Sequence, residues 1–302
     1  MPTLSLIIAT YNRAAQLVTA LESLAVQTAP AESWECIVVD NNSADDTAQR
    51  FAEFVSSRQL SNFRIVAESR QGLSHARNRG IAESRGVYIT IIDDDEYVNE
   101  GFVEAYISFF DSHPRYSVAG GRVIAQYPSG RRPKEIPPLV EQALANPMDF
   151  GAEVCEFPAG KIPAGGNMAF RRETLLRYDC FNVSLGRTGQ QLTGGEESDL
   201  FERMQADGLK FAYVHDAVIW HVIPPSKLTP EYLRRLAFGT GISQRRRAEL
   251  HNRVGRLYIG ECAKWVATLL LACWYTFTLR PERGRRLLMM RLHTTRGIIK
   301  KE

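Results

Sequence analysis

Three consecutive aspartates, Asp93, Asp94 and Asp95, directly follow an apolar run over residues 86–92. The run is short and rich in β-branched and aromatic residues, which predicts a buried strand. Adjacent carboxylates at the end of such a strand repel one another, and a cation among them relieves that repulsion. Hard oxygen ligands suit Mg²⁺ or Mn²⁺, ions that usually also hold substrate phosphates. The alternative is an acidic turn that caps a helix beginning near Asn99, although a cap requires only one carboxylate.

Strands and helices alternate before this acidic run. Strand-like segments cover residues 4–10, 34–40, 63–66 and 87–92, and helical segments cover 14–27, 45–60 and 74–84. This alternation predicts a parallel sheet covered by helices on both faces. Ligands of such sheets bind beyond the carboxyl ends of the strands. Because Thr10, Asp40 and Asp93 all follow or end strands, we expect them to converge.

The second half of the chain has a less regular pattern. Residues 122–157 form a long, proline-rich segment that we expect to be a mobile loop. Helices over 171–176 and 197–208 and a strand over 210–220 follow, and Pro224-Pro225 stops that strand. We therefore expect a catalytic domain over residues 1–225 and a helical extension over residues 226–302.

Composition restricts the classes of protein that this chain can belong to. The 302 residues include 44% hydrophobic and 24% charged residues, as in ordinary globular proteins. The net charge of +3 is too small to argue for a nucleic-acid partner, although basic residues crowd the last third. Five widely spaced cysteines without a C-x-x-C pair fit a reducing cytoplasm. The N-terminus leads directly into strand-like sequence, so we expect no signal peptide.

Four segments and their spacing resemble one known family. They are residues 8–13 (IATYNR), 37–43 (IVVDNNS), 72–80 (GLSHARNRG) and 92–96 (IDDDE), followed by 194–200 (GGEESDL). Over roughly residues 3–225 the chain resembles the family 2 glycosyltransferases, which have the GT-A fold. The resemblance implies a Rossmann-like, mostly parallel sheet flanked by helices. It also implies transfer of a sugar from a nucleotide diphosphate sugar to an acceptor, with inversion at the anomeric carbon.

The resemblance implies that Tyr11 and Asp40 hold the nucleobase. A tyrosine can stack on a flat base, and a carboxylate can accept a hydrogen bond from an imide N–H such as uracil N3, which favours a UDP-sugar. The alternatives are a core tyrosine and a helix cap, although Asp45 is the better-placed cap. Other residues of these two loops are also expected at the nucleotide, namely Thr10, Asn12, Arg13 and Asn42.

The third segment is expected to approach the nucleotide as well. Gly72 allows the backbone to come close to a ligand. Arg77 and Arg79 are two residues apart on a helix and cannot share one face. The resemblance favours Arg77, with Asn78, as the inward pair. The alternative is a solvated basic helix face.

The resemblance assigns the acidic run to the diphosphate and the ribose. Asp93 is expected near the ribose and Asp95 at the metal, with Asp94 between them. A histidine at the position of His221 often completes the metal or diphosphate site in GT-A enzymes, and the alternative is a structural histidine. The predicted metal set is therefore Asp95, Asp93 and His221 around Mn²⁺ or Mg²⁺. Such an ion would neutralise charge as the diphosphate leaves.

Attack by a hydroxyl on an anomeric carbon requires a base, usually a carboxylate opposite the leaving group. In the family a Glu-Asp pair near a helix start has this role. Here the pair is Glu196-Glu197, followed by Asp199, and we rank Glu197 first, Asp199 second and Glu196 third. The alternative is that these acids complement the helix dipole. Asn167 is expected to bond a sugar hydroxyl, unless it is an ordinary turn residue.

Residues 265–279 form an apolar run of 15 residues, shorter than the roughly 20 that a spanning helix requires. We expect a helix at the membrane interface, with peripheral membrane contact through residues 257–290 and arginines on anionic lipid. The alternative is a buried hairpin packed on the catalytic domain.

The sequence thus predicts a metal-dependent, inverting glycosyltransferase. We expect it to act on a saccharide or lipid-linked acceptor in surface glycan synthesis, at the cytoplasmic face of the membrane and without nucleic acid. The alternative is a catalytically silent sugar-nucleotide-binding subunit of a membrane polysaccharide complex. A sugar-nucleotide pyrophosphorylase would need a glycine-rich loop after the first strand, which residues 10–13 lack.

Overall fold

The computed structural model describes residues 1–189 and 191–300. The chain forms two compact units. Unit 1 comprises Met1–Ile124, Pro147–Val183 and Glu196–His221, and unit 2 comprises Ala125–Asn146, Ser184–Gly195 and Val222–Glu302. The chain leaves unit 1 for the last time between His221 and Val222, close to the predicted domain boundary at Pro225. Residues 125–146 and 184–195, however, group with unit 2 and not with the predicted catalytic domain.

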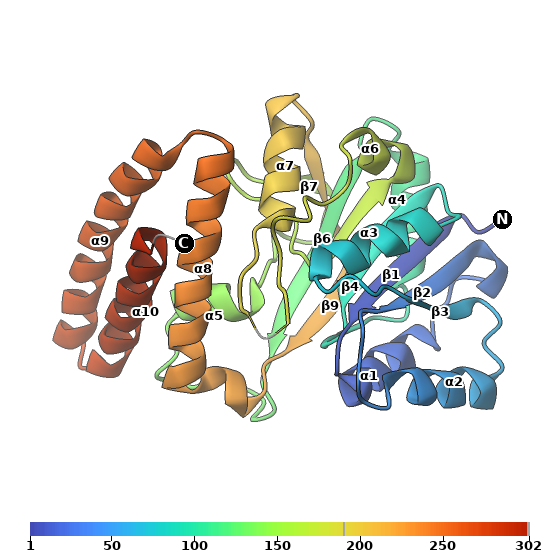
Figure 1. The fold of residues 1–302 in the computed structure, drawn as a ribbon, viewed down its shortest axis with the longest axis horizontal. Coiled ribbons are helices and arrows are strands. Elements are labelled where there is room, and N and C mark those ends of the chain that lie inside the picture. The colour runs from blue at the N-terminus through green and yellow to red at the C-terminus, as the bar shows by residue number, and fades with distance from the viewer. Residues whose placement is uncertain (190, 301–302) are drawn as a thin grey trace. The chain divides into compact units, whose positions relative to one another are not determined.

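In the part of the chain that the structure describes, nine strands form one sheet in the order β3-β2-β1-β4-β8-β6-β9-β5, with β7 paired to β9 (Figure 1). They are β1 (Leu4–Thr10), β2 (Trp34–Asp40), β3 (Phe63–Ala67), β4 (Tyr88–Asp93), β5 (Glu96–Val98), β6 (Val118–Gln126), β7 (Cys155–Glu156), β8 (Met168–Arg171) and β9 (Phe211–Val222). Strands β1 to β4 pair in parallel, as the alternation predicted. Strand β8 pairs antiparallel with both β4 and β6, and β5 and β7 pair antiparallel with β9, so this half of the sheet contains antiparallel pairs.

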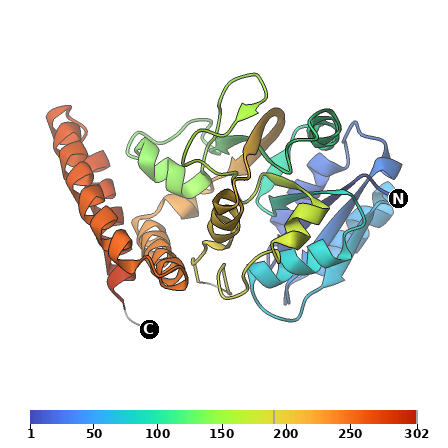
Figure 2. The same cartoon turned by 90° about the horizontal axis from the view of Figure 1, so that it is seen from above.

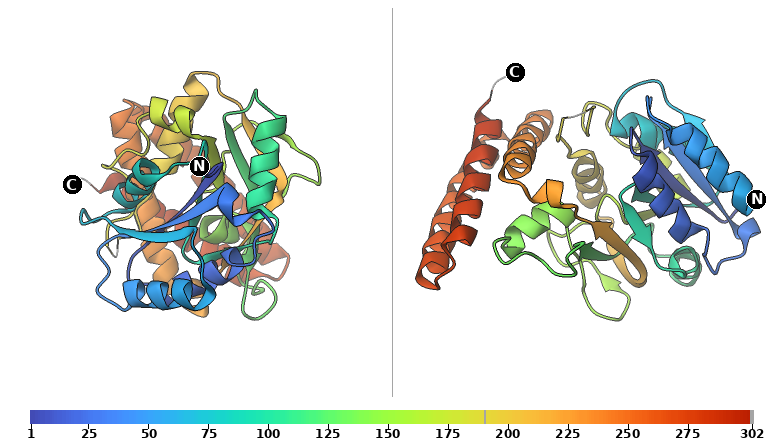
Figure 3. Two further views of the ribbon diagram at one scale, coloured as in Figure 1. Left: turned by 90° about the vertical axis from the view of Figure 1, so that its right-hand side faces the viewer. Right: turned by 90° about the horizontal axis from the view of Figure 1, so that it is seen from below.

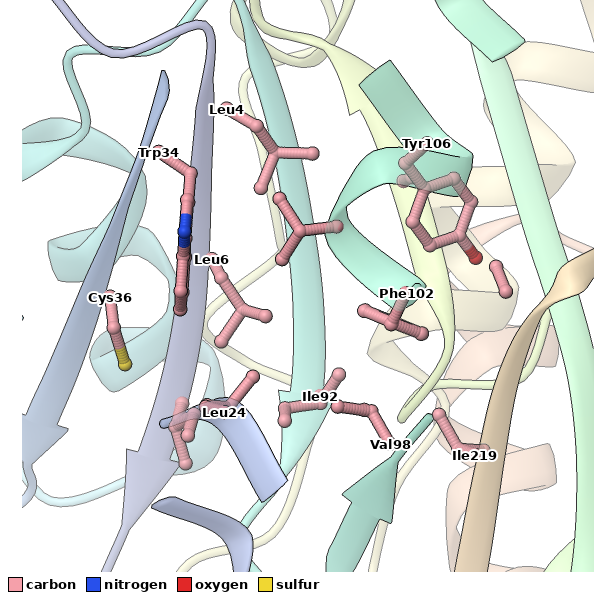
Figure 4. Packing of buried hydrophobic residues seen from close by; sticks show 14 of the residues in the cluster. Leu4, Leu6, Leu24, Trp34, Cys36, Ile92, Val98, Phe102, Tyr106 and Ile219 are labelled. Carbon is pink, nitrogen blue, oxygen red and sulfur yellow. The ribbon is translucent and has the colours of Figure 1, made fainter. Parts of the chain in front are cut away.

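Helices cover both faces of this sheet, which confirms the predicted α/β class. The helices of unit 1 are α1 (Ala14–Leu24), α2 (Thr47–Arg58), α3 (Leu73–Glu83), α4 (Phe102–Ser112), α6 (Arg172–Arg177) and α7 (Glu196–Ala206). Alternation along β1 decides which face each side chain meets, because successive side chains point to opposite sides. Leu4 and Leu6 pack with α1, α2 and α4, including Phe102 (Figure 4). Ile7 packs in the other cluster, with α3, α6 and α7.

The register of the parallel strands brings the predicted site residues to one edge. Thr10 at the end of β1 is opposite Asp40 at the end of β2. On the other side of β1, Ala9 is opposite Asp93 at the end of β4. The expected convergence of these carboxyl ends is therefore confirmed.

Unit 2 is mainly helical (Figures 2 and 3). Its helices are α5 (Pro138–Ala145), α8 (Pro230–Leu250), α9 (Val254–Phe277) and α10 (Pro281–Ile299). The expectation that residues 122–157 form one long loop is wrong. Pro138 occupies the first turn of α5, where its missing N–H costs nothing, and Ile136 and Val140 are buried in the core of unit 2.

Helices α8 and α10 cross where both carry glycine. A Cβ on Gly241 would lie 2.1 Å from the carbonyl oxygen of Thr294, and one on Gly297 would lie 2.2 Å from that of Phe238. These distances leave no room for a methyl group. The two backbones therefore touch at this crossing.

We predict that Gly297→Ala lowers the free energy of unfolding by about 1–3 kcal/mol, because a rigid backbone must move to admit the methyl group. Gly260→Ala in α9 is the matched control, since nothing lies within 4 Å of its Cβ position. It should raise stability by about 0.5–1 kcal/mol through helix propensity. Urea unfolding of both variants measures the difference, and shifts of the same sign would contradict the close crossing.

Candidate active site

A buried arginine joins three acids at the edge of the sheet. Arg77, on α3, is 1% exposed. Its Nη1 donates to Glu196 at 3.0 Å and to Glu197 at 2.8 Å, and its Nη2 donates to Asp93 at 2.9 Å. The guanidinium also lies over the ring of Phe181, with 5.5 Å from Cζ to the ring centroid. One cation thus connects the end of β4 with the start of α7.

Arg77 faces inward, as predicted. Arg79 lies on another face of the helix and pairs with Glu83 at 2.9 Å. The predicted nucleotide contact of Arg77 requires revision, because its outer nitrogens already bond protein carboxylates. Asn78 likewise exchanges two hydrogen bonds with the backbone of Phe181, at 2.8 and 3.0 Å. Both side chains therefore hold the protein together at this edge.

The two glutamates at the start of α7 differ in exposure and in charge. Burial, reinforced by the neighbouring carboxylate, raises the pKa of Glu196 to about 8 despite the attraction of Arg77. Burial also acts to raise the pKa of Glu197, but Arg77 outweighs it and lowers that pKa. The Glu197 side chain is 22% exposed, whereas that of Glu196 is 1% exposed. At neutral pH Glu197 is therefore the ionised and accessible member of the pair.

Gly165 and Gly166 leave room for two carboxyl groups, those of Glu197 and of Glu96 on β5. A Cβ on Gly165 would lie 2.2 Å from Oε1 of Glu197, and one on Gly166 would lie 2.0 Å from Oε2 of Glu96. The carbonyl of Gly165 also accepts a hydrogen bond from Arg77 at 3.2 Å. Neither glycine has a positive φ. Space for the carboxylates is therefore the reason for glycine here.

Asp94 and Asp95 share a second cation, Arg13. Its Nη1 donates to Asp94 at 2.8 Å and to Asp95 at 3.2 Å. Asp94 also accepts a hydrogen bond from Thr10 at 2.9 Å and is buried. Burial raises the pKa of Asp94 to about 6, which Asp95 increases and Arg13 opposes. The predicted nucleotide contacts of Thr10 and Asp94 therefore require revision, since each side chain bonds the other.

Glu96 is a site residue that the sequence patterns did not single out. It pairs across β5 and β9 with His221, whose Nδ1 lies 3.3 Å from Glu96 Oε1. Its other oxygen accepts the backbone N–H of Asp93 at 3.1 Å. Burial raises the pKa of Glu96 to about 7, and the hydrogen bond with His221 opposes this rise. A fourth acid after three aspartates was the available signal.

The predicted metal ligands only partly come together. His221 Nε2 lies 3.9 Å from Asp95 Oδ1, whereas Asp93 bonds Arg77. Among residues 1–189 and 191–300, no three His, Cys, Asp or Glu side chains form a group that could hold a metal. A magnesium-type ion binds each ligand at about 2.0–2.1 Å and usually takes only one or two carboxylates plus phosphates. Asp95 and His221 are the two predicted ligands that approach each other, and Asp93 and Asp95 each also bond an arginine.

The loops after β1 and β2 are tied together near the predicted base site. The backbone N–H of Asn12 donates to Ser43 Oγ at 2.9 Å, and Asn12 Oδ1 accepts the N–H of Ala44 at 2.7 Å. Asp40 Oδ1 accepts the N–H of Ser43 at 3.0 Å. Asp45 bonds the N–H of Ala14, at the start of α1, at 3.2 Å. These bonds fix the loop next to Tyr11, which is half-buried.

Asn41 orders the third loop, although the sequence patterns did not assign it a role. Its Nδ2 donates to the carbonyls of Glu68 and Arg70, and its Oδ1 accepts the N–H of Gly72 at 2.8 Å. Gly72 has a φ of 145° just before α3. This backbone conformation, and not only approach to a ligand, requires glycine there. Asn42 follows with a φ of 73°, which asparagine tolerates.

Two predicted contacts require revision because the side chains serve the fold. Asn167 is fully buried, accepts a hydrogen bond from Tyr106 and donates to the carbonyls of Arg122 and Ala217. It joins strands of the sheet, so a sugar hydroxyl has no access to it. Asp199 is also buried and bonds Arg203 at 3.0 Å, which disfavours it as the base.

We predict that Glu196→Gln changes how stability depends on pH. Because the folded-state pKa of Glu196 is about 8 against an ordinary value of 4.5, the folded protein retains a proton that the unfolded chain loses. Wild-type stability should therefore fall, relative to the variant, by about 1.4 kcal/mol per pH unit from roughly pH 5 to pH 8. Urea unfolding at several pH values tests this, and parallel curves would contradict it.

The family described as Glycosyl transferase family 2 matches residues 5–178, more than half of the chain. The glycosyltransferase AglE of Haloferax volcanii is 34% identical over 131 residues, which are 43% of this chain and 42% of AglE. TarS of Staphylococcus aureus, a poly(ribitol-phosphate) β-N-acetylglucosaminyltransferase, is 29% identical over 109 residues, covering 36% of this chain and 19% of TarS. The chain thus matches less than half the length of these relatives.

Solved structures agree on the fold. The mannosyltransferase PcManGT from Pyrobaculum calidifontis, in complex with GDP-Man and Mn²⁺, has a TM-score of 0.63 at 17% identity, covering 100% of this chain and 88% of that one. TarS residues 1–349 in complex with UDP give a TM-score of 0.55 at 19% identity, covering 98% and 90%. The arrangement of strands and helices is therefore that of the GT-A fold. Together with the match over residues 5–178, this shows that the chain belongs to glycosyl transferase family 2.

Proposed function

We propose that this protein transfers a sugar from a nucleotide diphosphate sugar to an acceptor hydroxyl, with inversion at the anomeric carbon. The contacts of Arg77 carry this proposal. They connect Asp93, on the edge where the donor is expected, with Glu197, the ionised acid at the start of α7. A displacement at carbon requires the base and the donor to be held in fixed relative positions, and these contacts fix the start of α7 relative to the end of β4.

Glu197 is the proposed base. An ionised, partly exposed carboxylate can take the proton of the acceptor hydroxyl as its oxygen bonds to the anomeric carbon and the nucleoside diphosphate leaves. Glu196 retains a proton up to a pKa of about 8, so it cannot accept one at neutral pH. The contact of Asp199 with Arg203 supports a bracing role for that acid.

Asp95 and His221 are the proposed protein ligands of Mn²⁺ or Mg²⁺, with donor phosphates completing the coordination. The ion would supply positive charge to the departing diphosphate. Tyr11 and Asp40 are proposed to hold the base, with Asn12 and Asn42 in the same loops. Uridine is the favoured base, because Asp40 can accept a hydrogen bond from its imide.

The acceptor is proposed to be a saccharide or a lipid-linked saccharide of the cell envelope. Support comes from TarS, whose name describes transfer to poly(ribitol phosphate). The helices of unit 2 combine many Lys and Arg residues with exposed apolar side chains on α9. This combination supports the proposal that the protein binds the inner face of the membrane. The competing function is a silent subunit that binds sugar nucleotides without turnover.

We predict that Glu197→Gln lowers kcat about 10²- to 10⁴-fold and leaves donor binding unchanged, because the amide cannot take a proton but its oxygen can still accept the hydrogen bond of Arg77. Asp199→Asn, the matched control on the same helix, should mainly lower thermal stability. Turnover and nucleotide binding of both variants are compared with those of wild type. A wild type that binds nucleotide without turnover supports the silent subunit, and a Glu197→Gln variant with normal kcat removes this residue as the base.

We predict that UDP binding requires Mn²⁺ and is lost in Asp95→Ala, because phosphates and carboxylate share the ion. Calorimetric titration of UDP with and without Mn²⁺ measures this. Glu53→Ala, which removes an exposed acid from α2, should bind like wild type. Binding without the ion would argue against the metal site, and binding of GDP but not UDP would replace the proposed base.

A further inference from the structure

One side of α9 is apolar and exposed. Six residues define this stripe, with exposed fractions from 50% at Leu269 to 82% at Phe277: Ile259, Val266, Leu269, Leu270, Trp274 and Phe277. At 3.6 residues per turn they lie within a sector of about 140°. The two charged residues between 257 and 277, Glu261 and Lys264, lie outside that sector. The stripe therefore presents only apolar groups.

The opposite side of α9 packs inside unit 2. Glu261 bonds Arg291 at 3.0 Å, and Trp265 Nε1 donates to Thr295 at 2.8 Å. Ala272 packs against Gly284, whose Cβ position is 3.1 Å from the alanine carbonyl oxygen. These contacts hold α9 alongside α10 (Figure 1). The stripe is thus a fixed outer surface of the helix.

Length and composition would allow α9 to cross a membrane. Its packing disfavours that orientation. Helix α10 carries Arg285, Arg286, Arg291 and Arg296 beside it, and a crossing helix would draw these charges toward hydrocarbon. A helix lying in the interface buries its apolar stripe and leaves the charged partner in water.

The charge of unit 2 favours an anionic surface as the partner that covers the stripe. The segments of unit 2 contain 21 Lys and Arg against 7 Asp and Glu, whereas those of unit 1 contain 16 against 27. Exposed arginines stand at both ends of the stripe, with Arg256 before it and Arg280 and Arg285 after it. A second copy would bring equal positive charges together, which disfavours self-association through this side.

We propose that α9 lies in the plane of an anionic lipid surface, with the stripe in the boundary between headgroups and acyl chains. This rests on the membrane contact of the proposed function and deepens it by naming the side of α9 that enters the lipid. The basic residues around the stripe attract the surface, and the apolar side chains hold the helix there. Lipid binding does not require catalysis, so it can be measured separately.

Flotation of the whole chain with vesicles tests whether the stripe binds an anionic lipid surface. We expect binding to phosphatidylglycerol–phosphatidylcholine vesicles, weakened by salt, and at least about tenfold weaker binding to phosphatidylcholine alone. Leu270→Gln/Phe277→Gln should weaken binding about tenfold or more, because two large side chains no longer enter the lipid. Val87→Gln/Leu176→Gln, which replaces exposed apolar residues of unit 1, should bind like wild type.

Equal binding by wild type and the α9 variant would overturn the proposal. So would a dimer in sedimentation that the α9 variant abolishes without any vesicle binding, since that assigns the stripe to a second copy. Transfer to a soluble acceptor is assayed without vesicles in parallel. Loss of vesicle binding with retained transfer separates this proposal from the proposed function.

Two native cysteines test the orientation. Cys262 and Cys273 are exposed and 11 residues apart, hence about 16 Å apart along α9 and nearly on one side. Variants that keep one of them, with the other and Cys155 and Cys180 changed to serine, are spin-labelled on anionic vesicles. Equal depths of the two labels support a helix in the plane, and depths that differ by more than about 10 Å would overturn it.

Discussion

A buried guanidinium that needs counter-charges constrains this structure most. Removing Arg77 from water is costly unless it is paired and hydrogen-bonded, and it bonds three acidic side chains, Asp93 on β4 and Glu196 and Glu197 on α7. Helix α3, the end of β4 and the start of α7 must therefore stay in register. Without this cation, Glu197 would lose the charge that lowers its pKa. The geometry of the proposed base thus follows from satisfying one arginine.

Environment gives chemically similar acids different properties. Glu196 and Glu197 are neighbours in the chain, yet burial raises the pKa of one to about 8 and Arg77 lowers that of the other. Two acids whose environments separate their pKa values can take different chemical parts. The glycine pair contributes to this, because Gly165 allows Glu197 to lie against the backbone.

The two units divide the charge of the chain between them. Unit 1 carries the excess of acids and contains the candidate active site. Unit 2 carries the excess of Lys and Arg together with the apolar stripe of α9. An overall charge of +3 conceals this division. Such a distribution suits the proposal that unit 1 binds a metal and a nucleotide and that unit 2 binds an anionic surface.

The sequence by itself determined the alternation of strands and helices, the parallel direction of β1 to β4 and the convergence of Thr10, Asp40 and Asp93. Those features depend on hydrophobic periodicity and strand ends, which are local. Only the tertiary structure decided that Arg77 bonds Glu196, 119 residues away, and that Glu96 faces His221. It also turned Asn167 into the sheet and grouped residues 125–146 with unit 2. Each of these depends on a partner distant in the chain, which no local pattern encodes.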